Sequence, residues 1–187
     1  RLVVEAEAMH RRAIGILQKG RGQNNPTLAT SLNNLAELVA YQARTSEAEL
    51  LYHQAQTIWE QLVEPEHPNV AACLNNRAGL CRKMGRFADA ERFYRKALAI
   101  WEKTEGQGQV NMAASLNNLA QLYMTQGRYL EVEPLLRRAL SIQEKQLGPN
   151  HADIAATLAV SLAKVKTDIF RGREALRRAL SGAHASR

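Results

Sequence analysis

An all-α solenoid of antiparallel helix pairs, with about nine helices, is the fold that this sequence predicts, and three observations predict it. The tripeptide Leu-Asn-Asn begins at Leu32, Leu74 and Leu116, so it recurs every 42 residues without a gap. Other residues recur in the same register: Glu49, Glu91 and Glu133; Ala36, Ala78 and Ala120; Ala55, Ala97 and Ala139. Ala and Leu supply most of the apolar residues, whereas aromatic residues make up only 5%. A fixed period of this length with helix-forming residues is typical of a helical repeat array.

The repeat divides the chain into units of two helices each. We expect one repeat domain over residues 1–187, with a half unit at 1–25, full units at 27–68, 69–110 and 111–152, a degenerate unit at 153–182 and a tail at 183–187. Gly85 and Gly127 are expected to end the first helix of their units, and Ala43 takes that position in the first full unit. Alanines recur in both helices of a unit, as expected where two helices approach closely.

The N-terminal helix, expected over residues 3–20, matches the second helix of a unit and has no first helix before it. We therefore expect Leu2, Val3, Val4 and Ile14 to expose an apolar strip, which a second copy of the chain could cover in a homodimer. The chain begins at Arg1 rather than Met, so we expect it to be part of a longer protein.

Composition argues against a membrane protein and for a reducing compartment. The longest apolar runs are far shorter than the roughly 18 residues that a membrane span requires, and no signal peptide is visible. Cys73 and Cys81 lie eight residues apart in one expected helix, which separates their Cα atoms by roughly 12 Å and prevents a disulfide. A cytoplasmic location is therefore expected.

No catalytic or cofactor site can be assembled from the sequence. The five histidines are scattered, no Cys/His pair has zinc-ligand spacing, and the loop glycines complete no phosphate-binding motif. We expect no enzymatic activity, no cofactor and no metal site.

The motifs resemble those of a known repeat family. They are Leu116–Ala120, Gly127–Tyr129, Arg137–Leu140 and Leu147–His151, and their pattern resembles the tetratricopeptide repeat, in particular the 42-residue repeats of kinesin light chains and their bacterial relatives. The resemblance implies a right-handed superhelix whose first helices line a concave groove, and a function in binding partner proteins or peptides. Kinesin light chains take acidic peptides, so the resemblance also favours an acidic partner.

Matched to this family, the following residues are expected in the groove: Asn33, Asn34, Glu37, Asn75, Asn76, Arg82, Lys83, Asn117, Asn118 and Gln121. An Asn side chain both donates and accepts, so it can pair with a peptide backbone. In the alternative, one Asn of each pair bonds the neighbouring helix instead. Arg82 and Lys83 would make the middle of the groove basic, which suits a carboxylate, although two solvated charges at a helix end remain the alternative.

Two further functions stay open. The chain could be the sensor segment of a larger bacterial signalling protein, for instance behind an NTPase module. The second helices also carry basic pairs, at Arg11–Arg12, Arg95–Lys96, Arg137–Arg138 and Arg177–Arg178, within a net charge of +7. Such a ladder could bind nucleic acid, but glutamates lie on the same helices at spacings that allow pairing. We therefore expect a solvated face there.

Overall fold

The chain is helical throughout its described part, as the repeat predicts. A computed structural model describes residues 2–20, 25–104, 108–147 and 167. Within these ranges there is no strand, and the helices are α1 (Leu2–Gly20), α2 (Pro26–Tyr41), α3 (Thr45–Leu62), α4 (Pro68–Lys83), α5 (Phe87–Glu102), α6 (Gly108–Thr125) and α7 (Tyr129–Leu147). The other expected helices fall beyond Leu147, on residues that are not described apart from Thr167. The all-α fold is thus confirmed, with seven helices in the described ranges.

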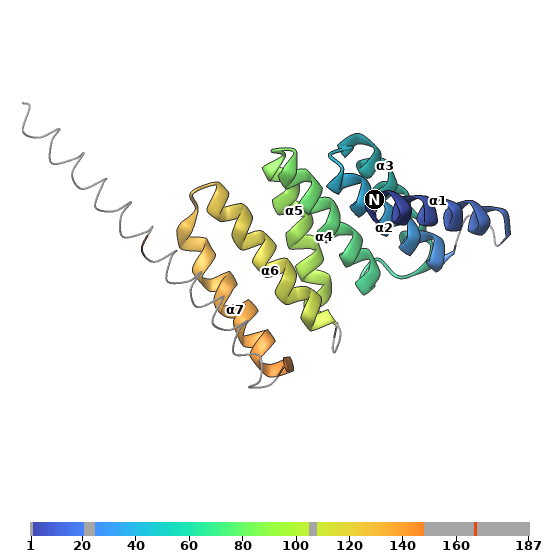
Figure 1. Cartoon of the computed structure of the whole chain (residues 1–187). Helices are drawn as coiled ribbons and strands as arrows, with labels where there is room; N and C mark the ends of the chain where they lie inside the picture. The colour runs from blue at the N-terminus through green and yellow to red at the C-terminus, as the bar shows by residue number, and fades with distance from the viewer. Residues whose placement is uncertain (1, 21–24, 105–107, 148–166, 168–187) are drawn as a thin grey trace, which may run out of the picture. The chain divides into compact units, whose positions relative to one another are not determined.

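The chain divides into two compact units, Arg1–Ser115 and Leu116–Arg187. In the first unit α1 packs on α2, α2 on α3, α3 on α4 and α4 on α5, and α2 also contacts α4 (Figure 1). The first helices of the repeat are therefore α2 and α4, and the second helices are α1, α3 and α5. In the second unit the chain turns back at Gly127 into α7.

Alanines lie at the closest contacts between helices. In the first unit each of these side chains has no exposed surface: Ala29, Ala36, Ala48, Ala55, Ala71, Ala78, Ala90 and Ala97. Leucines and aromatic residues such as Leu28, Leu35 and Tyr94 fill the space beside them, each at most 2% exposed. Because a methyl group is the whole side chain at these contacts, the helix backbones can approach closely and the larger residues interdigitate around them.

The first helices α2 and α4 begin with the same short-range interactions. The Asn25 side chain accepts a hydrogen bond from the Thr27 N–H at 2.8 Å, and the His67 Nδ1 atom accepts one from the Asn69 N–H at 3.2 Å. In both cases a proline follows at the first helical position, where its missing N–H costs nothing. The capping side chain and the proline that follows it therefore set where α2 and α4 begin.

Each first helix also ends in the same way. Arg44, Arg86 and Arg128 donate their backbone N–H to the carbonyl five residues earlier, at 3.1, 2.9 and 2.9 Å. The residue before each of them has a positive φ, which is 61° at Ala43, 74° at Gly85 and 72° at Gly127. This arrangement is a Schellman motif, so the expected stops are confirmed, and Ala43 is the one residue of the three whose Cβ opposes the conformation.

Within Arg1–Ser115, an ion pair links each two-helix repeat to the repeat that follows it. The Arg44 Nη1 atom lies 2.8 Å from Glu7 Oε1, and the Arg86 Nη1 atom lies 2.6 Å from Glu49 Oε1; the partners are 37 positions apart in sequence each time. Gln42 also donates to Glu7 at 2.7 Å, and Arg11 to the same carboxylate at 2.8 Å. These hydrogen bonds lower the pKa of Glu7 to about 2, and the bond from Gln42 has the largest effect on that pKa.

The expected apolar strip on α1 is only partly correct. Val4 is 67% exposed and Val3 is half-buried, but Ile14 is 8% exposed because it lies on the side of α1 that packs against α2. The side chain of Leu2 is outside the described residues. Met9 and Ile16, which are 73% and 62% exposed, are the apolar residues that α1 presents to solvent instead.

Ala43→Gly is expected to stabilise the protein by about 0.5–1 kcal/mol, because it removes the Cβ from a left-handed position. Urea unfolding followed by circular dichroism measures the change in the free energy of unfolding. Ala99→Gly is the matched control: Ala99 is exposed within α5, so glycine there should cost about 1 kcal/mol. Equal losses in the two variants would contradict the prediction.

Glu7→Gln is expected to destabilise the protein at pH 7 and to flatten its acid unfolding. The folded pKa of Glu7 lies below its unfolded value, so its contribution is present above about pH 4.5 and is lost as the pH falls toward about 2. Thermal unfolding between pH 7 and pH 2 checks this. The difference in Tm between the wild type and the variant should shrink as the pH falls; a constant difference would contradict the assignment.

Candidate functional site

The paired asparagines form a hydrogen-bonded chain across the first helices. Asn76 donates through Nδ2 to Asn33 Oδ1 at 3.1 Å, which joins α4 to α2, and Asn75 donates through Nδ2 to Asn76 Oδ1 at 3.3 Å. All three side chains are half-buried, whereas Asn34 is exposed. For Asn33 and Asn76 the structure therefore shows the alternative left open by the sequence, in which an Asn of each pair bonds the neighbouring helix. The amides of Asn33 and Asn76 each keep hydrogen-bonding capacity beyond these bonds.

The charged residues expected beside the asparagines differ in their surroundings. Lys83 is exposed and forms no ion pair within the described ranges. Arg82 is half-buried; burial raises the pKa of the Tyr94 hydroxyl, and the nearby Arg82 guanidinium partly offsets the rise. Arg82 thus packs toward α5. Lys83 is the cation of this pair that a ligand could reach.

Two of the expected groove residues line a pocket between α1 and α2. Asn34 and Glu37 face Val3, Ala6 and His10 of α1 across a cavity of about 440 Å³. Tyr41, 78% exposed, lies one turn beyond Glu37 and also lines it. The structure thus brings Asn34 and Glu37 together at one end of the first unit, while Asn75, Asn76, Arg82 and Lys83 lie on α4.

The remaining expected residues lie on α6 in the second unit. Asn117 and Asn118 are half-buried and Gln121 is exposed. In this unit the guanidinium of Arg128 also stacks on the Tyr123 ring, 3.9 Å from its centroid. A groove role for Asn117, Asn118 and Gln121 stays a prediction from the repeat register.

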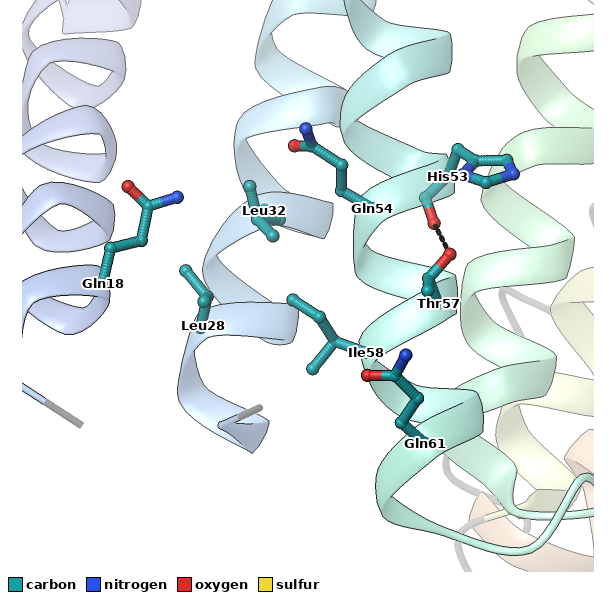
Figure 2. A pocket seen from close by; sticks show the side chains of 8 residues that line it. All are labelled: Gln18, Leu28, Leu32, His53, Gln54, Thr57, Ile58 and Gln61. Atoms are coloured by element: carbon teal, nitrogen blue, oxygen red, sulfur yellow. Dashed lines mark hydrogen bonds between the residues drawn. The ribbon is translucent and has the colours of Figure 1, made fainter. Parts of the chain in front are cut away.

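A second pocket, which the sequence did not reveal, opens between α1 and α3. Figure 2 shows Gln18 of α1 facing Gln54, Ile58 and Gln61 of α3, with Leu28 and Leu32 of α2 between them. Its volume is about 700 Å³, and among the described residues no Asp, Glu, Lys or Arg side chain lines it. The signal was present in the register: one unit later the positions of Gln18, Gln54 and Gln61 hold Glu60, Lys96 and Lys103. The second helix α3 has His53 and Gln54 where the other second helices have a basic pair, so the basic ladder is interrupted at this pocket.

One arginine of each described basic pair forms an ion pair on its own helix. Arg11 bonds Glu7, Arg95 bonds Glu91 and Arg137 bonds Glu133, each four residues away on the same helix, at 2.8, 2.7 and 2.8 Å. These pairs lie on exposed helix surfaces, as expected for a solvated face. Arg177 and Arg178 are outside the described residues.

Burial limits the reactivity of the two cysteines. Cys73 and Cys81 are free and buried, and burial raises the pKa of both thiols, that of Cys73 to about 12. Both thiols therefore stay protonated, and poorly nucleophilic, near neutral pH.

Across the described ranges no group of three or more His, Cys, Asp or Glu residues is placed to hold a metal ion. No helix in those ranges is long and apolar enough to cross a membrane.

Comparison with known proteins agrees with this geometry. Tetratricopeptide repeat models match residues 28–69, and 51–103 together with 111–181, which is more than half of the chain. The chain belongs to the tetratricopeptide repeat family. Proteins built from tetratricopeptide repeats generally act in protein–protein interaction and are generally not enzymes. A search of curated proteins found no match.

Solved structures share the tetratricopeptide fold. The nearly identical TPR-like repeats of a kinesin light chain candidate from Podosopora anserina match with a TM-score of 0.73 at 24% identity, covering 98% of this chain and 86% of that one. BtubC (BKLC) from P. vanneervenii matches at 0.69 and 23%, covering 96% and 75%. The N-terminal domain of stress-induced protein-1 from C. elegans matches at 0.52 and 17%, covering 72% and 96%. The resemblance to kinesin light chain repeats is thus confirmed at the level of fold.

Asn76→Ala is expected to destabilise this tetratricopeptide protein by about 1 kcal/mol, because it removes the bonds to Asn33 and Asn75. Asn34→Ala is the matched control, since Asn34 is exposed and makes no hydrogen bond within the described ranges. Both variants gain the same helix propensity, so the difference between them isolates the hydrogen bonds. Chemical unfolding measures it, and equal stabilities would contradict a structural role for Asn76.

Proposed function

We propose that this chain is a non-catalytic docking module that binds a peptide segment of a partner protein on the surface of α2 and α4. The observation that carries the proposal is the hydrogen bond between the half-buried amides of Asn33 and Asn76; Asn76 lies on the helix that also carries the exposed cation of Lys83, two turns further on. The donors and acceptors that Asn33 and Asn76 do not use in this bond can pair with the main chain of an extended peptide. The family's general role in protein–protein interaction supports the same function.

The proposed peptide is acidic. Lys83 is exposed without an ion pair within the described ranges, whereas Arg11, Arg95 and Arg137 of the second helices are each paired with a glutamate four residues away. A carboxylate can therefore bind at Lys83 without displacing an internal partner. The net charge of +7 attracts acidic partners toward the protein from a distance.

The ion pairs of Arg11, Arg95 and Arg137 argue against nucleic acid as the ligand, because they neutralise part of the positive charge of the basic ladder. No observation favours a sensor segment behind an NTPase module. We further propose a reducing, cytoplasmic environment, since Cys73 and Cys81 are both free.

Lys83→Gln is expected to weaken binding of an acidic peptide about two- to fivefold, the effect of one exposed charge contact. The probe is a synthetic 12-residue peptide of Glu and Asp with one Trp, and its Gln/Asn counterpart serves as the neutral probe. Fluorescence anisotropy at two salt concentrations measures both affinities.

Lys96→Gln is the matched control, because Lys96 is exposed on α5 and its loss changes the net charge equally. If Lys96→Gln weakens binding as much as Lys83→Gln does, attraction by net charge explains the result and the proposed site is wrong. Equal affinity for the acidic and the neutral probe would contradict the acidic preference.

A further inference from the structure

Gly79 interrupts a row of polar side chains on α4. Asn76 lies three residues before it and Lys83 four residues after it, and residues at these spacings share one face of a helix. Gly79 is half-buried, so this position reaches the surface. At the same repeat position α2 carries Glu37 and α6 carries Gln121, both of them exposed. The row on α4 therefore has a gap where the other described first helices have a long polar side chain.

Neither the backbone nor the packing of α4 requires a glycine at this position. A Cβ atom added at Gly79 would lie 3.6 Å from the Tyr94 hydroxyl oxygen, which is an ordinary van der Waals contact, and outside the adjoining helix backbone no other described atom would come within 4 Å. The φ of Gly79 is not left-handed, unlike that of Gly85. A glycine inside a helix still costs stability relative to alanine, because the unfolded chain gains conformational freedom. Gly79 therefore weakens α4 without a packing reason.

The first full repeat shows what fills the same space elsewhere. Tyr52 of α3 stands at the repeat position of Tyr94, and Glu37 stands at that of Gly79. Burial raises the pKa of the Tyr52 hydroxyl and the negative charge of Glu37 raises it further, so the two groups are close enough to interact. Tyr94 is buried as deeply as Tyr52, at 1% against 3% exposed, but the position above it has no side chain. The surface of α4 is therefore lower at Gly79 by one side chain.

We propose that the main chain of the bound peptide lies against α4 at Gly79, and that the missing side chain is what gives it room. This inference rests on the proposed function, in which one peptide contacts both the amide of Asn76 and the cation of Lys83. Gly79 lies between these two contacts on one helix face, so the peptide covers it. A main chain within about 3 Å of a half-buried amide runs close to the helix. A side chain at residue 79 would stand in its path.

Gly79 then also determines on which helix an acidic peptide binds. In α2 the side chain of Glu37 occupies the path and repels a carboxylate, and in α6 the side chain of Gln121 occupies it without offering a charge. Discrimination between similar surfaces is often achieved by such unfavourable contacts at the wrong site. Gly79 is thus a specificity-determining residue of the proposed site, although it contributes no side chain to it.

Gly79→Ala and Gly79→Gln test this in the full chain, with the acidic 12-residue peptide of Glu and Asp as the probe. Gly79→Gln introduces the residue that α6 holds at this position. We expect Gly79→Ala to weaken binding about threefold and Gly79→Gln at least about tenfold, because the added atoms push the peptide away from the amide of Asn76. Gly79→Ala should at the same time raise Tm by about 2–4 °C, because alanine is the better helix former.

Gly15→Ala is the matched control, because Gly15 lies within α1 and a Cβ atom added there would have no described neighbour within 4 Å. It should raise Tm by a similar amount and leave the affinity unchanged. Nuclear magnetic resonance gives a second measurement on isotope-labelled protein. The amide signal of Gly79, identified by its absence from the spectrum of Gly79→Ala, should shift when the acidic peptide is added, whereas that of Gly15 should not.

Equal affinities of the wild type, Gly79→Ala and Gly79→Gln, with Lys83→Gln still binding more weakly, would overturn this inference and leave the proposed function standing. A lower Tm for Gly79→Ala than for the wild type would show that packing requires the glycine, and would also overturn it. If the wild type binds neither the acidic nor the neutral peptide, the proposed function is wrong and this inference is wrong with it.

Discussion

Close contact between helix backbones at fully buried alanines is the constraint on which the rest of the first compact unit depends. Ala36 and Ala78 in the first helices, and Ala55 and Ala97 in the second, have no exposed surface. A larger side chain at such a contact would push the helices apart and open gaps around the leucines beside it. The position of every other residue, including the asparagines that bridge α2 and α4, follows from this spacing.

Away from these contacts the units differ, and the differences carry the possible functions. Arg77 stands where the other units have Leu35 and Leu119, and it is accommodated by a hydrogen bond to Gln56 and by stacking 4.6 Å over the Phe93 ring. The pocket between α1 and α3 differs from the next unit in the same way, because the glutamines that line it stand at positions that hold charged residues one unit later (Figure 2). A constant framework of small residues therefore allows the surface to vary from unit to unit.

The fold could be predicted from the sequence because the same pattern of residues occurs in three successive units. The stops at Gly85 and Gly127 and the contact alanines followed from spacing alone, and Ala43 was recognised by its place in the register. The site was harder to predict. Spacing places Asn76 on the surface of α4 but does not say whether its amide turns to solvent or to Asn33, and this depends on the distance between helices. Likewise the burial of Ile14 depends on which side of α1 meets α2, which one helix cannot reveal.

The ion pairs Glu7–Arg44 and Glu49–Arg86 join residues that are 37 positions apart, and Glu66–Lys103 has the same separation. Each pair joins a residue of one two-helix unit to a residue of the next unit. The first two pairs occupy equivalent repeat positions, so duplication or loss of one complete unit of 42 residues would regenerate that link, whereas an insertion of any other length within a unit would misalign its partners. The length of an array like this one can therefore change in evolution by whole units, with this ion pair formed again between the new neighbours.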